Sequence, residues 1–186
     1  MQWNIPNILT LFRIVLIPVF VVAFYWPESG WNHVITTSIF FVAGISDWFD
    51  GYLARKLNQQ SAFGAFLDPV ADKLMVAVAL ILLVGADPGA FTAVPAAIII
   101  GREITISALR EWMAQVGDNA KVKVSNIGKI KTAAQMLAVG FLLYRAPVGA
   151  FPTTEIGYGL LYLAAALTLW SMVVYLRAAW SSLTKA

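Results

Sequence analysis

The chain contains no cysteine and a single histidine, His33, among its 186 residues. The absence of cysteine excludes disulfide bonds and thiolate chemistry. Charged residues are also scarce, at 12% of the chain, compared with about 25% in soluble proteins. Hydrophobic residues make up 60% of the positions, and the mean hydropathy is +0.75. These proportions exclude an ordinary soluble protein and indicate an integral membrane protein.

Long apolar stretches recur along the chain, each near the ~20 residues that a helix needs to cross the hydrocarbon core. They lie at residues 8–26, 33–54, 69–86, 91–109, 127–144 and 156–180. The first stretch is too long for a signal peptide and lacks a small-residue cleavage pattern, so we expect it to remain as the first span. The sequence therefore predicts an all-α integral membrane protein with six transmembrane helices, in a single domain over residues 1–186.

Lysine and arginine are unevenly distributed among the predicted connections. They gather around the second and fourth connections and near both termini, whereas residues 27–33 and 85–91 contain neither. By the positive-inside tendency, both termini lie in the cytoplasm, and we expect the protein in the cytoplasmic (inner) membrane. The net charge of +3 and the pI of about 9.3 suit anionic lipid headgroups or a phosphorylated substrate. Nucleic acid is not an expected partner, because the basic residues form no separate basic domain.

Four aspartates at fixed spacing interrupt the apolar sequence of the second and third predicted spans. The pattern is DxxDGxxAR, then eight residues, then GxxxDxxxD, and its members are Asp47, Asp50, Gly51, Ala54, Arg55, Gly64, Asp68 and Asp72. Positions i, i+3, i+4 and i+7 share one face of a helix, so the first two aspartates form a stripe with Gly51 and Ala54. The last two aspartates form a second stripe if the third helix extends back to Gly64.

Carboxylates on two neighbouring helices would repel one another unless a cation compensates them. A hard divalent cation takes oxygen ligands, so the pattern predicts a site for Mg²⁺, or alternatively Mn²⁺, with two ions expected. The predicted ligands are Asp47, Asp50, Asp68 and Asp72. Glycine and alanine on the same face leave room for a ligand to approach the backbone.

Some of these residues also have a purely structural interpretation. Asp68 directly precedes Pro69 and could cap a helix that begins there, with Asp72 in its first turn. Gly51 could belong to a close helix-packing face, and Arg55 could anchor the helix end instead of contacting phosphate. The first two aspartates resist such an explanation, because they follow an apolar run into a helix interior where an acid is costly.

The complete pattern resembles the signature of the CDP-alcohol phosphotransferases, six-helix membrane enzymes that join a CDP-activated group to an alcohol and release CMP. Three further segments extend the resemblance over most of the chain: residues 4–13 (NIPNILTLFR), 101–112 (GREI and ALREW) and 128–136 (GKIKTAAQM). These segments are most similar to family members that transfer the phosphatidyl group of CDP-diacylglycerol to sn-glycerol 3-phosphate. The resemblance implies that reaction, by metal-assisted in-line displacement, with phosphatidylglycerophosphate and CMP as products.

The resemblance also implies roles for individual residues. Asp72 would complete the second metal site or accept the proton of the attacking hydroxyl. CDP-diacylglycerol would be bound by Gly51, Ala54, Arg55 and Gly64, with Asn7 and Thr10 of the first span in contact with its nucleotide or headgroup. Membrane lipids would surround its acyl chains, and a homodimer is implied.

A phosphorylated acceptor needs cationic groups near the aspartates. The resemblance favours Arg110, Lys131 and Arg177, near the cytoplasmic ends of the last three predicted spans. For each of them, a solvated or lipid-anchoring charge is the alternative. Arg102 and Glu103 lie within the fourth span, where we expect them to pair because unpaired charges in a membrane are expensive.

Other functions share parts of this pattern. A sibling transferase would use the same aspartates with serine or inositol phosphate as acceptor. An intramembrane prenyltransferase also gathers aspartates around magnesium, but it would normally be longer. A divalent-cation transporter could use the same carboxylates near the bilayer midplane, whereas the aspartates here lie toward one face.

Overall fold

The computed structural model describes residues 5–27, 31–57, 62–115 and 126–183. Within these ranges the chain forms six helices: α1 (Ile5–Tyr25), α2 (Asn32–Leu57), α3 (Ala62–Ala86), α4 (Ala90–Gln115), α5 (Asn126–Tyr144) and α6 (Thr153–Leu183). A single isolated bridge joins Val148 and Phe151 between the last two helices of this described part. The prediction of an all-α fold is confirmed, and each helix overlaps one of the predicted apolar stretches.

Four helices contain an apolar stretch long enough to cross a membrane: Asn7–Tyr25 in α1, Pro69–Ala86 in α3, Ala90–Gln115 in α4 and Thr153–Arg177 in α6. In α5 the apolar stretch, Ile130–Tyr144, is shorter, and the described residues of α2 provide none of comparable length and hydropathy. The chain is therefore a multi-pass membrane protein. The total of six spans stays a prediction.

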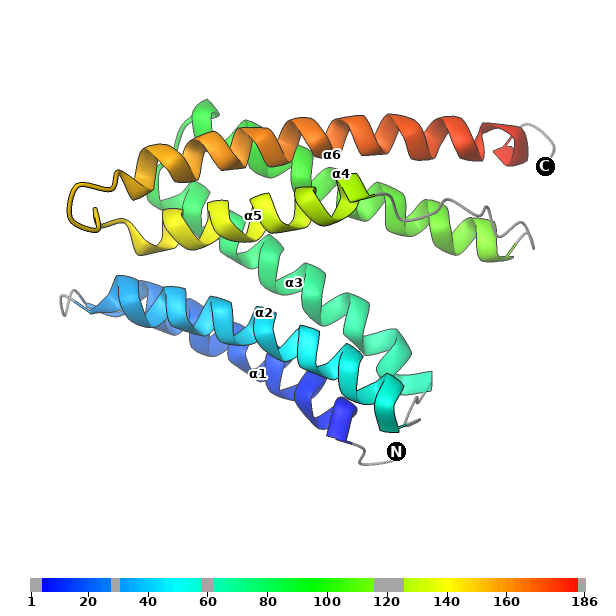
Figure 1. Ribbon diagram of the computed structural model, residues 1–186, viewed down its shortest axis with the longest axis horizontal. Coiled ribbons are helices and arrows are strands. Elements are labelled where there is room, and N and C mark those ends of the chain that lie inside the picture. Colours follow the sequence, from blue (N-terminus) through cyan, green and yellow to red (C-terminus); the bar gives the residue numbers. More distant parts are fainter. Residues whose placement is uncertain (1–4, 28–30, 58–61, 116–125, 184–186) are drawn as a thin grey trace.

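The helices form two groups joined by α3. α1 and α2 lie side by side, α4, α5 and α6 gather on the opposite side, and α3 runs obliquely between them (Figure 1). α3 contacts α1, α2, α4 and α5, and α5 packs most extensively against α6. The C-terminal end of α2 and the N-terminal end of α3 lie at the same end of the molecule (Figure 1), so both halves of the aspartate pattern lie toward that end.

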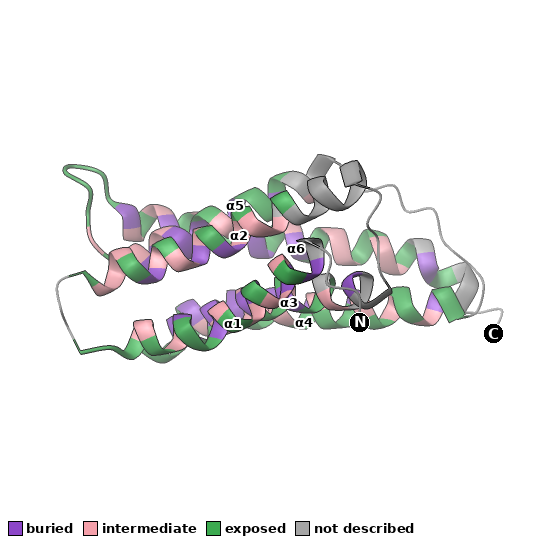
Figure 2. Cartoon of the chain, turned by 90° about the horizontal axis from the view of Figure 1, so that it is seen from below, coloured by how far each residue is buried: buried purple, intermediate pink, exposed green. Residues whose placement is uncertain are grey.

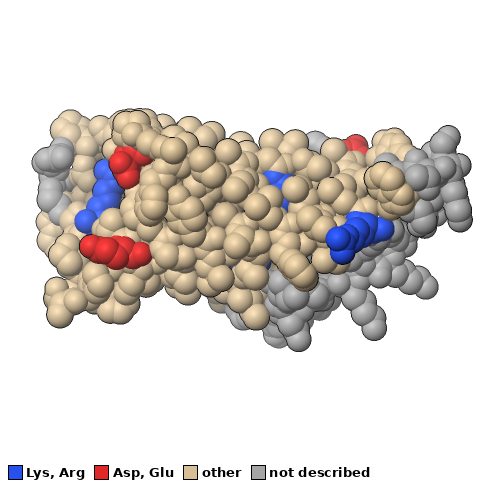
Figure 3. Space-filling view, turned by 90° about the horizontal axis from the view of Figure 1, so that it is seen from above, with Lys and Arg blue, Asp and Glu red and all other residues tan. Residues whose placement is uncertain are grey.

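Buried residues lie mainly where helices face one another, and exposed residues cover much of the outside (Figure 2). Phe20 of α1 and Phe40 of α2 are fully buried, with ring centroids 6.4 Å apart. Ile81 and Trp170 are among many large apolar side chains that are exposed. Among the described residues, charged side chains occupy small separate areas of the face shown in Figure 3. An apolar exterior of this kind suits contact with lipid.

Glycine allows α2 and α5 to approach closely. A Cβ atom at Gly140 of α5 would lie 2.5 Å from Cζ of Phe41 on α2. A Cβ atom at Gly44 of α2 would lie 2.6 Å from Cε of Met136 on α5. Because a side chain at either position would collide with its neighbour, the two glycines permit this crossing.

The third helix begins well before the apolar stretch that predicted it. α3 starts at Ala62 and contains Pro69 in its interior. Gly64, Asp68 and Asp72 therefore lie on one helix at i, i+4 and i+8, as the second stripe required. The interpretation of Asp68 as the cap of a helix starting at Pro69 is wrong, because the backbone is already helical before it.

Polar contacts fix the beginning of α4 against α6. Asp87, between α3 and α4, accepts hydrogen bonds from the hydroxyl of Tyr158 on α6 and from Oγ1 of Thr92 on α4, the latter at 3.2 Å. The hydroxyl of Tyr162 donates to the carbonyl of Phe91 at 3.0 Å. These contacts help to determine which face of α4 is turned toward α5 and α6.

Candidate active site

A cavity of about 870 Å³ lies between α3, α4, α5 and α6. Its charged part contains four cations and two carboxylates, which are Lys73, Arg102, Arg110, Lys131, Asp72 and Glu103. The described lining therefore has an excess of two positive charges. Such an excess attracts a doubly charged anion.

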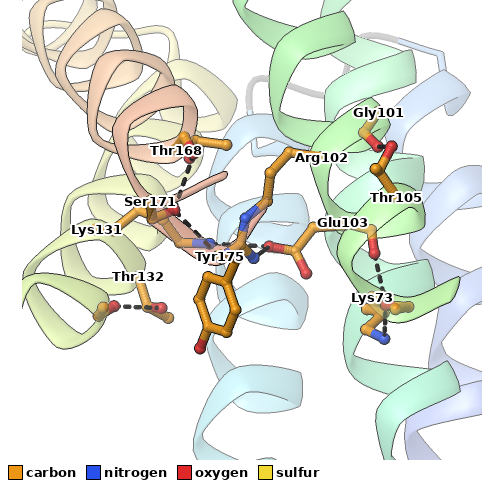
Figure 4. A network of polar contacts seen from close by, with 12 residues as sticks. Lys73, Gly101, Arg102, Glu103, Thr105, Lys131, Thr132, Thr168, Ser171 and Tyr175 are labelled. Atoms are coloured by element: carbon orange, nitrogen blue, oxygen red, sulfur yellow. Dashed lines mark hydrogen bonds and ion pairs between the residues drawn. The ribbon is translucent and has the colours of Figure 1, made fainter. Parts of the chain in front are cut away.

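Glu103 lies at the centre of the charged part (Figure 4). Its Oε1 accepts hydrogen bonds from Nη1 of Arg102 at 2.8 Å and from Nζ of Lys131 at 2.9 Å. Nη2 of Arg102 also donates to Oγ of Ser171 at 3.2 Å. One carboxylate on α4 thus connects α4 and α5, and its arginine neighbour extends the network to α6.

Arg102 and Lys131 need the carboxylate of Glu103 because both cations are buried. The side chains of Arg102 and Lys131 are only 10% and 7% exposed, and that of Glu103 is 26% exposed. A buried charge is strongly unfavourable unless an opposite charge and hydrogen bonds compensate it. The predicted Arg102–Glu103 pair is confirmed, and the structure adds Lys131 to it.

Arg110 lies at the same cavity through a contact with α6. Its Nη2 donates to the hydroxyl of Tyr175 at 2.8 Å, and its guanidinium carbon lies 5.1 Å from the centroid of that ring. The guanidinium carbon of Arg102 lies 5.7 Å from the same centroid. Tyr175 therefore contacts two arginines, and cation–π attraction helps to hold both.

Lys73 of α3 reaches across the cavity to α4. Its Nζ donates to Oγ of Ser107, and that hydroxyl donates to the carbonyl of Glu103 at 2.5 Å. Lys73 follows Asp72 directly, so the two place opposite charges side by side on the cavity wall. The sequence did not identify Lys73 as a site residue.

The first half of the aspartate pattern is joined to α1. Nη1 of Arg13 lies 2.5 Å from Oδ1 of Asp47, and the arginine side chain is only 2% exposed. Asn7 and Thr10 of α1 are also buried, and with Arg13 they lie within an arc of about 120° around the helix. From the sequence, Arg13 has two interpretations: an anchor at the start of the first span, or a contact to the nucleotide or lipid headgroup that the family resemblance permits. The structure adds a pairing with Asp47, as expected for an arginine inside a membrane span.

The two aspartates of the pattern whose side chains are described, Asp47 and Asp72, are close enough for their charges to interact. Asp72 interacts electrostatically with Asp47, with Arg13 and with Glu103. Asp72 thus belongs to the aspartate pattern and also lines the cationic cavity. A ligand bound at Asp72 would therefore lie close to Asp47 of the pattern and to the cations of the cavity.

The donor set suits a divalent cation by its chemistry. Asp47 and Asp72 provide carboxylate oxygens from α2 and α3, two helices that are in contact, and carboxylate oxygen is the ligand that Mg²⁺ prefers. Among the described side chains, no group of three acidic or histidine residues gathers closely enough to hold a metal ion. The four-ligand set therefore stays a prediction.

The other members of the pattern are placed by their backbone alone. The helical ranges of α2 and α3 contain Asp50, Gly51, Ala54, Arg55 and Asp68, but their side chains lie outside the described part of the structure. Gly64 is described and is buried in α3. The convergence of all four carboxylates stays a prediction.

The structure separates the three predicted acceptor-phosphate residues. Arg110 and Lys131 line the large cavity together. Arg177 is exposed and instead lines a separate pocket with Val173, Leu176 and Trp180. The structure thus brings two of the three candidates to Asp72 and does not bring Arg177 there.

Comparisons with known proteins point to one family. Residues 3–170 match the family described as CDP-alcohol phosphatidyltransferase. A relative from Haemophilus influenzae is 55% identical over 183 residues, covering 98% of this chain and 97% of the relative. Relatives from Salmonella typhimurium and Escherichia coli are 53% and 52% identical over 179 residues, covering 96% of both chains. All three are named CDP-diacylglycerol–glycerol-3-phosphate 3-phosphatidyltransferase.

Proposed function

The chain belongs to the CDP-alcohol phosphatidyltransferase family, and from this premise we propose that it transfers the phosphatidyl group of CDP-diacylglycerol to sn-glycerol 3-phosphate. The products are phosphatidylglycerophosphate and CMP. Three relatives that are more than 50% identical to this chain are named for this activity. The chain is thus a phospholipid-synthesising transferase of the membrane.

The observation that carries the choice of acceptor is the charge of the cavity beside Asp72. Its described lining has four cations against two carboxylates. A phosphate monoester carries about −1.5 to −2 charges at neutral pH, which matches this excess. Lys131 and Arg110 would bind the acceptor phosphate, with Arg102 and Lys73 adding positive potential. Serine has no phosphate, so the cavity favours a phosphorylated acceptor over serine.

The apolar part of the same cavity supports a lipid donor. Several apolar residues that line it are exposed, namely Val70, Leu74, Ile104, Trp170 and Val174. The cavity is therefore open toward the region where lipid would lie. A diacylglycerol substrate could keep its acyl chains in the bilayer while its headgroup reaches Asp72.

The reaction needs a hydroxyl, a phosphorus atom and a leaving group in line. The terminal hydroxyl of the acceptor attacks the phosphatidyl phosphorus, the bond to the CMP oxygen breaks, and the hydroxyl proton leaves. We assign acceptance of this proton to Asp72, because it borders the cationic cavity. Lys131 and Arg110 orient the acceptor, so that its hydroxyl points toward α3.

Asp47, Asp50, Asp68 and Asp72 would hold divalent metal, with Mg²⁺ first, Mn²⁺ second and two ions in the complete site. When bound, the metal supplies Lewis-acid stabilisation of charge on the phosphate oxygens. Gly51, Ala54, Arg55 and Gly64 would contact CDP-diacylglycerol, with Asn7 and Thr10 on the α1 side. The burial of Gly64, Asn7 and Thr10 supports this placement.

The proposal also covers the membrane, the orientation and the oligomeric state of the enzyme. All six helices would span the cytoplasmic (inner) membrane, with both termini and the aspartate end in the cytoplasm, and two copies would form a homodimer. The distribution of lysine and arginine along the chain supports this orientation.

CMP release tests the proposed function. Purified protein in detergent would receive CDP-diacylglycerol and Mg²⁺ with sn-glycerol 3-phosphate, serine, inositol phosphate or no acceptor. We expect release that depends on sn-glycerol 3-phosphate. Release with another acceptor would overturn the acceptor assignment, and no release with any acceptor would overturn the proposed reaction.

A further inference from the structure

The neutral polar side chains of the large cavity differ in whether they already have partners. The lining includes Ser107, Thr132, Gln135, Ser171 and Tyr175. Ser107 bonds to Lys73 and to the carbonyl of Glu103, and Oγ1 of Thr132 donates to the carbonyl of Gly128 at 3.0 Å.

The two neutral groups on α6 are also engaged. Oγ of Ser171 donates to the carbonyl of Thr168 at 2.9 Å and accepts from Arg102. The hydroxyl of Tyr175 accepts from Arg110. Gln135 is the exception within the described lining, because its Oε1 is buried and has no hydrogen-bond partner.

An unpartnered amide oxygen in this position is costly. Gln135 is 6% exposed, and a buried acceptor without a donor loses its hydration with no compensating hydrogen bond. Native proteins rarely keep such a group without a reason. A ligand that enters the cavity and bonds to the carboxamide would remove this cost.

The position of Gln135 limits which part of a ligand it can contact. It follows Lys131 by four residues on α5, so both side chains project from the same face of the helix. The two positions are separated by about 6 Å along the helix axis. One small molecule can therefore contact the ammonium group of Lys131 through a phosphate and Gln135 through a group nearby.

We propose that Gln135 hydrogen-bonds the central hydroxyl of the glycerol phosphate acceptor and makes the enzyme selective for acceptors that carry it. This inference rests on the proposed function. The acceptor has three polar groups: the phosphate faces the cations, the terminal hydroxyl attacks beside Asp72, and the central hydroxyl is left. A hydroxyl both donates and accepts, so it suits either end of a carboxamide.

An acceptor without the central hydroxyl would leave Gln135 unbonded. A site built to hydrogen-bond a substrate hydroxyl rejects the analogue that lacks it, because its own polar group stays unpaired. The matching analogue is 3-hydroxypropyl phosphate, which keeps the phosphate and the attacking primary hydroxyl. Its reaction differs from that of sn-glycerol 3-phosphate only in the contact under test.

The experiment compares kcat/KM for the two acceptors in the wild-type protein and in Gln135→Met, which has a similar length and no amide. In the wild type, sn-glycerol 3-phosphate should be favoured at least about tenfold. In Gln135→Met the preference should fall to about twofold or less, through a loss with sn-glycerol 3-phosphate alone. Thr132→Val is the matched control, because that hydroxyl is already bonded to Gly128, and it should keep the wild-type preference.

A binding measurement keeps the inference testable if the variant turns over poorly. sn-Glycerol 3-phosphate should raise the thermal unfolding midpoint of the wild type more than that of Gln135→Met, whereas 3-hydroxypropyl phosphate should raise both equally. If Gln135→Met does not fold, Gln135→Leu takes its place. An unchanged preference in the Gln135 variant, or an equal loss in Thr132→Val, would overturn the inference. Failure of the proposed function is distinct, because the wild type would then release no CMP with either acceptor.

Discussion

Lys131 of α5 and Glu103 of α4 form an ion pair inside the cavity, with 2.9 Å between Nζ and Oε1. The same Glu103 oxygen also accepts a hydrogen bond from Arg102 at 2.8 Å. One carboxylate therefore holds two buried cations that would otherwise repel each other. Because these cations belong to the proposed acceptor site, the site exists before the acceptor binds.

Removal of the central negative charge should destabilise the protein. Glu103→Gln leaves Arg102 and Lys131 without a compensating carboxylate, and we expect a loss of about 1–3 kcal/mol in stability. Thermal unfolding in detergent measures the effect. Glu111→Gln is the control, because Glu111 is exposed on the same helix, and it should change stability by no more than about 0.5 kcal/mol. Equal midpoints for the two variants would count against a stabilising role for Glu103.

Asp72→Asn should separate binding from turnover. The amide keeps the shape of the side chain but accepts no proton, so CMP release should fall by about 10²–10⁴-fold. Binding of CDP-diacylglycerol, measured by its protection against thermal unfolding in the presence of Mg²⁺, should largely remain. If Asp72→Asn also abolished all metal binding, a role as proton acceptor alone would be refuted.

Tyr175 should act on the acceptor through Arg110. Tyr175→Phe keeps the ring near the guanidinium but removes the hydroxyl that accepts from Arg110 at 2.8 Å. We expect the KM for sn-glycerol 3-phosphate to rise about threefold in Tyr175→Phe and about tenfold in Arg110→Gln. Initial rates at saturating CDP-diacylglycerol provide the comparison. A similar rise in the KM for CDP-diacylglycerol would show that this pair does not serve the acceptor specifically.

The close crossing of α2 and α5 should depend on Gly140. Its Cβ in Gly140→Ala would lie 2.5 Å from Cζ of Phe41, and relief of such a collision typically costs about 1–3 kcal/mol. Gly159→Ala is the matched control, because it lies in α6 with open space at the Cβ position. That substitution should be neutral or stabilising, by about 0.5–1 kcal/mol, from helix propensity. Unfolding midpoints that fall equally in both variants would contradict this account of the packing.

The sequence predicted the helices well because each overlaps an apolar stretch, although the stretch in α5 is shorter and the described part of α2 is less hydrophobic. It also predicted the pair of Arg102 with Glu103, since adjacent opposite charges inside a membrane span need each other. The start of α3 was harder to predict, because the segment before Pro69 is less apolar than the stretch that follows. The second stripe depended on a helix that extends back to Gly64, and α3 does so.

The composition of the cavity could not be predicted, because it depends on how distant helices rotate against one another. Lys73, Glu103 and Lys131 come from three helices, and no local spacing relates them. Arg177 illustrates the same problem. It follows Tyr175 by two residues, which is about 200° around a helix, so when Tyr175 faces the cavity, Arg177 faces away from it. A resemblance to a family at single sequence positions does not predict how α6 is rotated about its axis.

The central claim is that the cationic cavity binds the phosphate of the acceptor. Steady-state kinetics of Lys131→Gln test it most directly, with Arg177→Gln as the comparison from the separate pocket. The KM for sn-glycerol 3-phosphate should rise at least about tenfold in Lys131→Gln, while the KM for CDP-diacylglycerol stays within about twofold of the wild type. Arg177→Gln should change the acceptor KM much less. An unchanged acceptor KM in Lys131→Gln, or an equal rise for both substrates, would contradict the account.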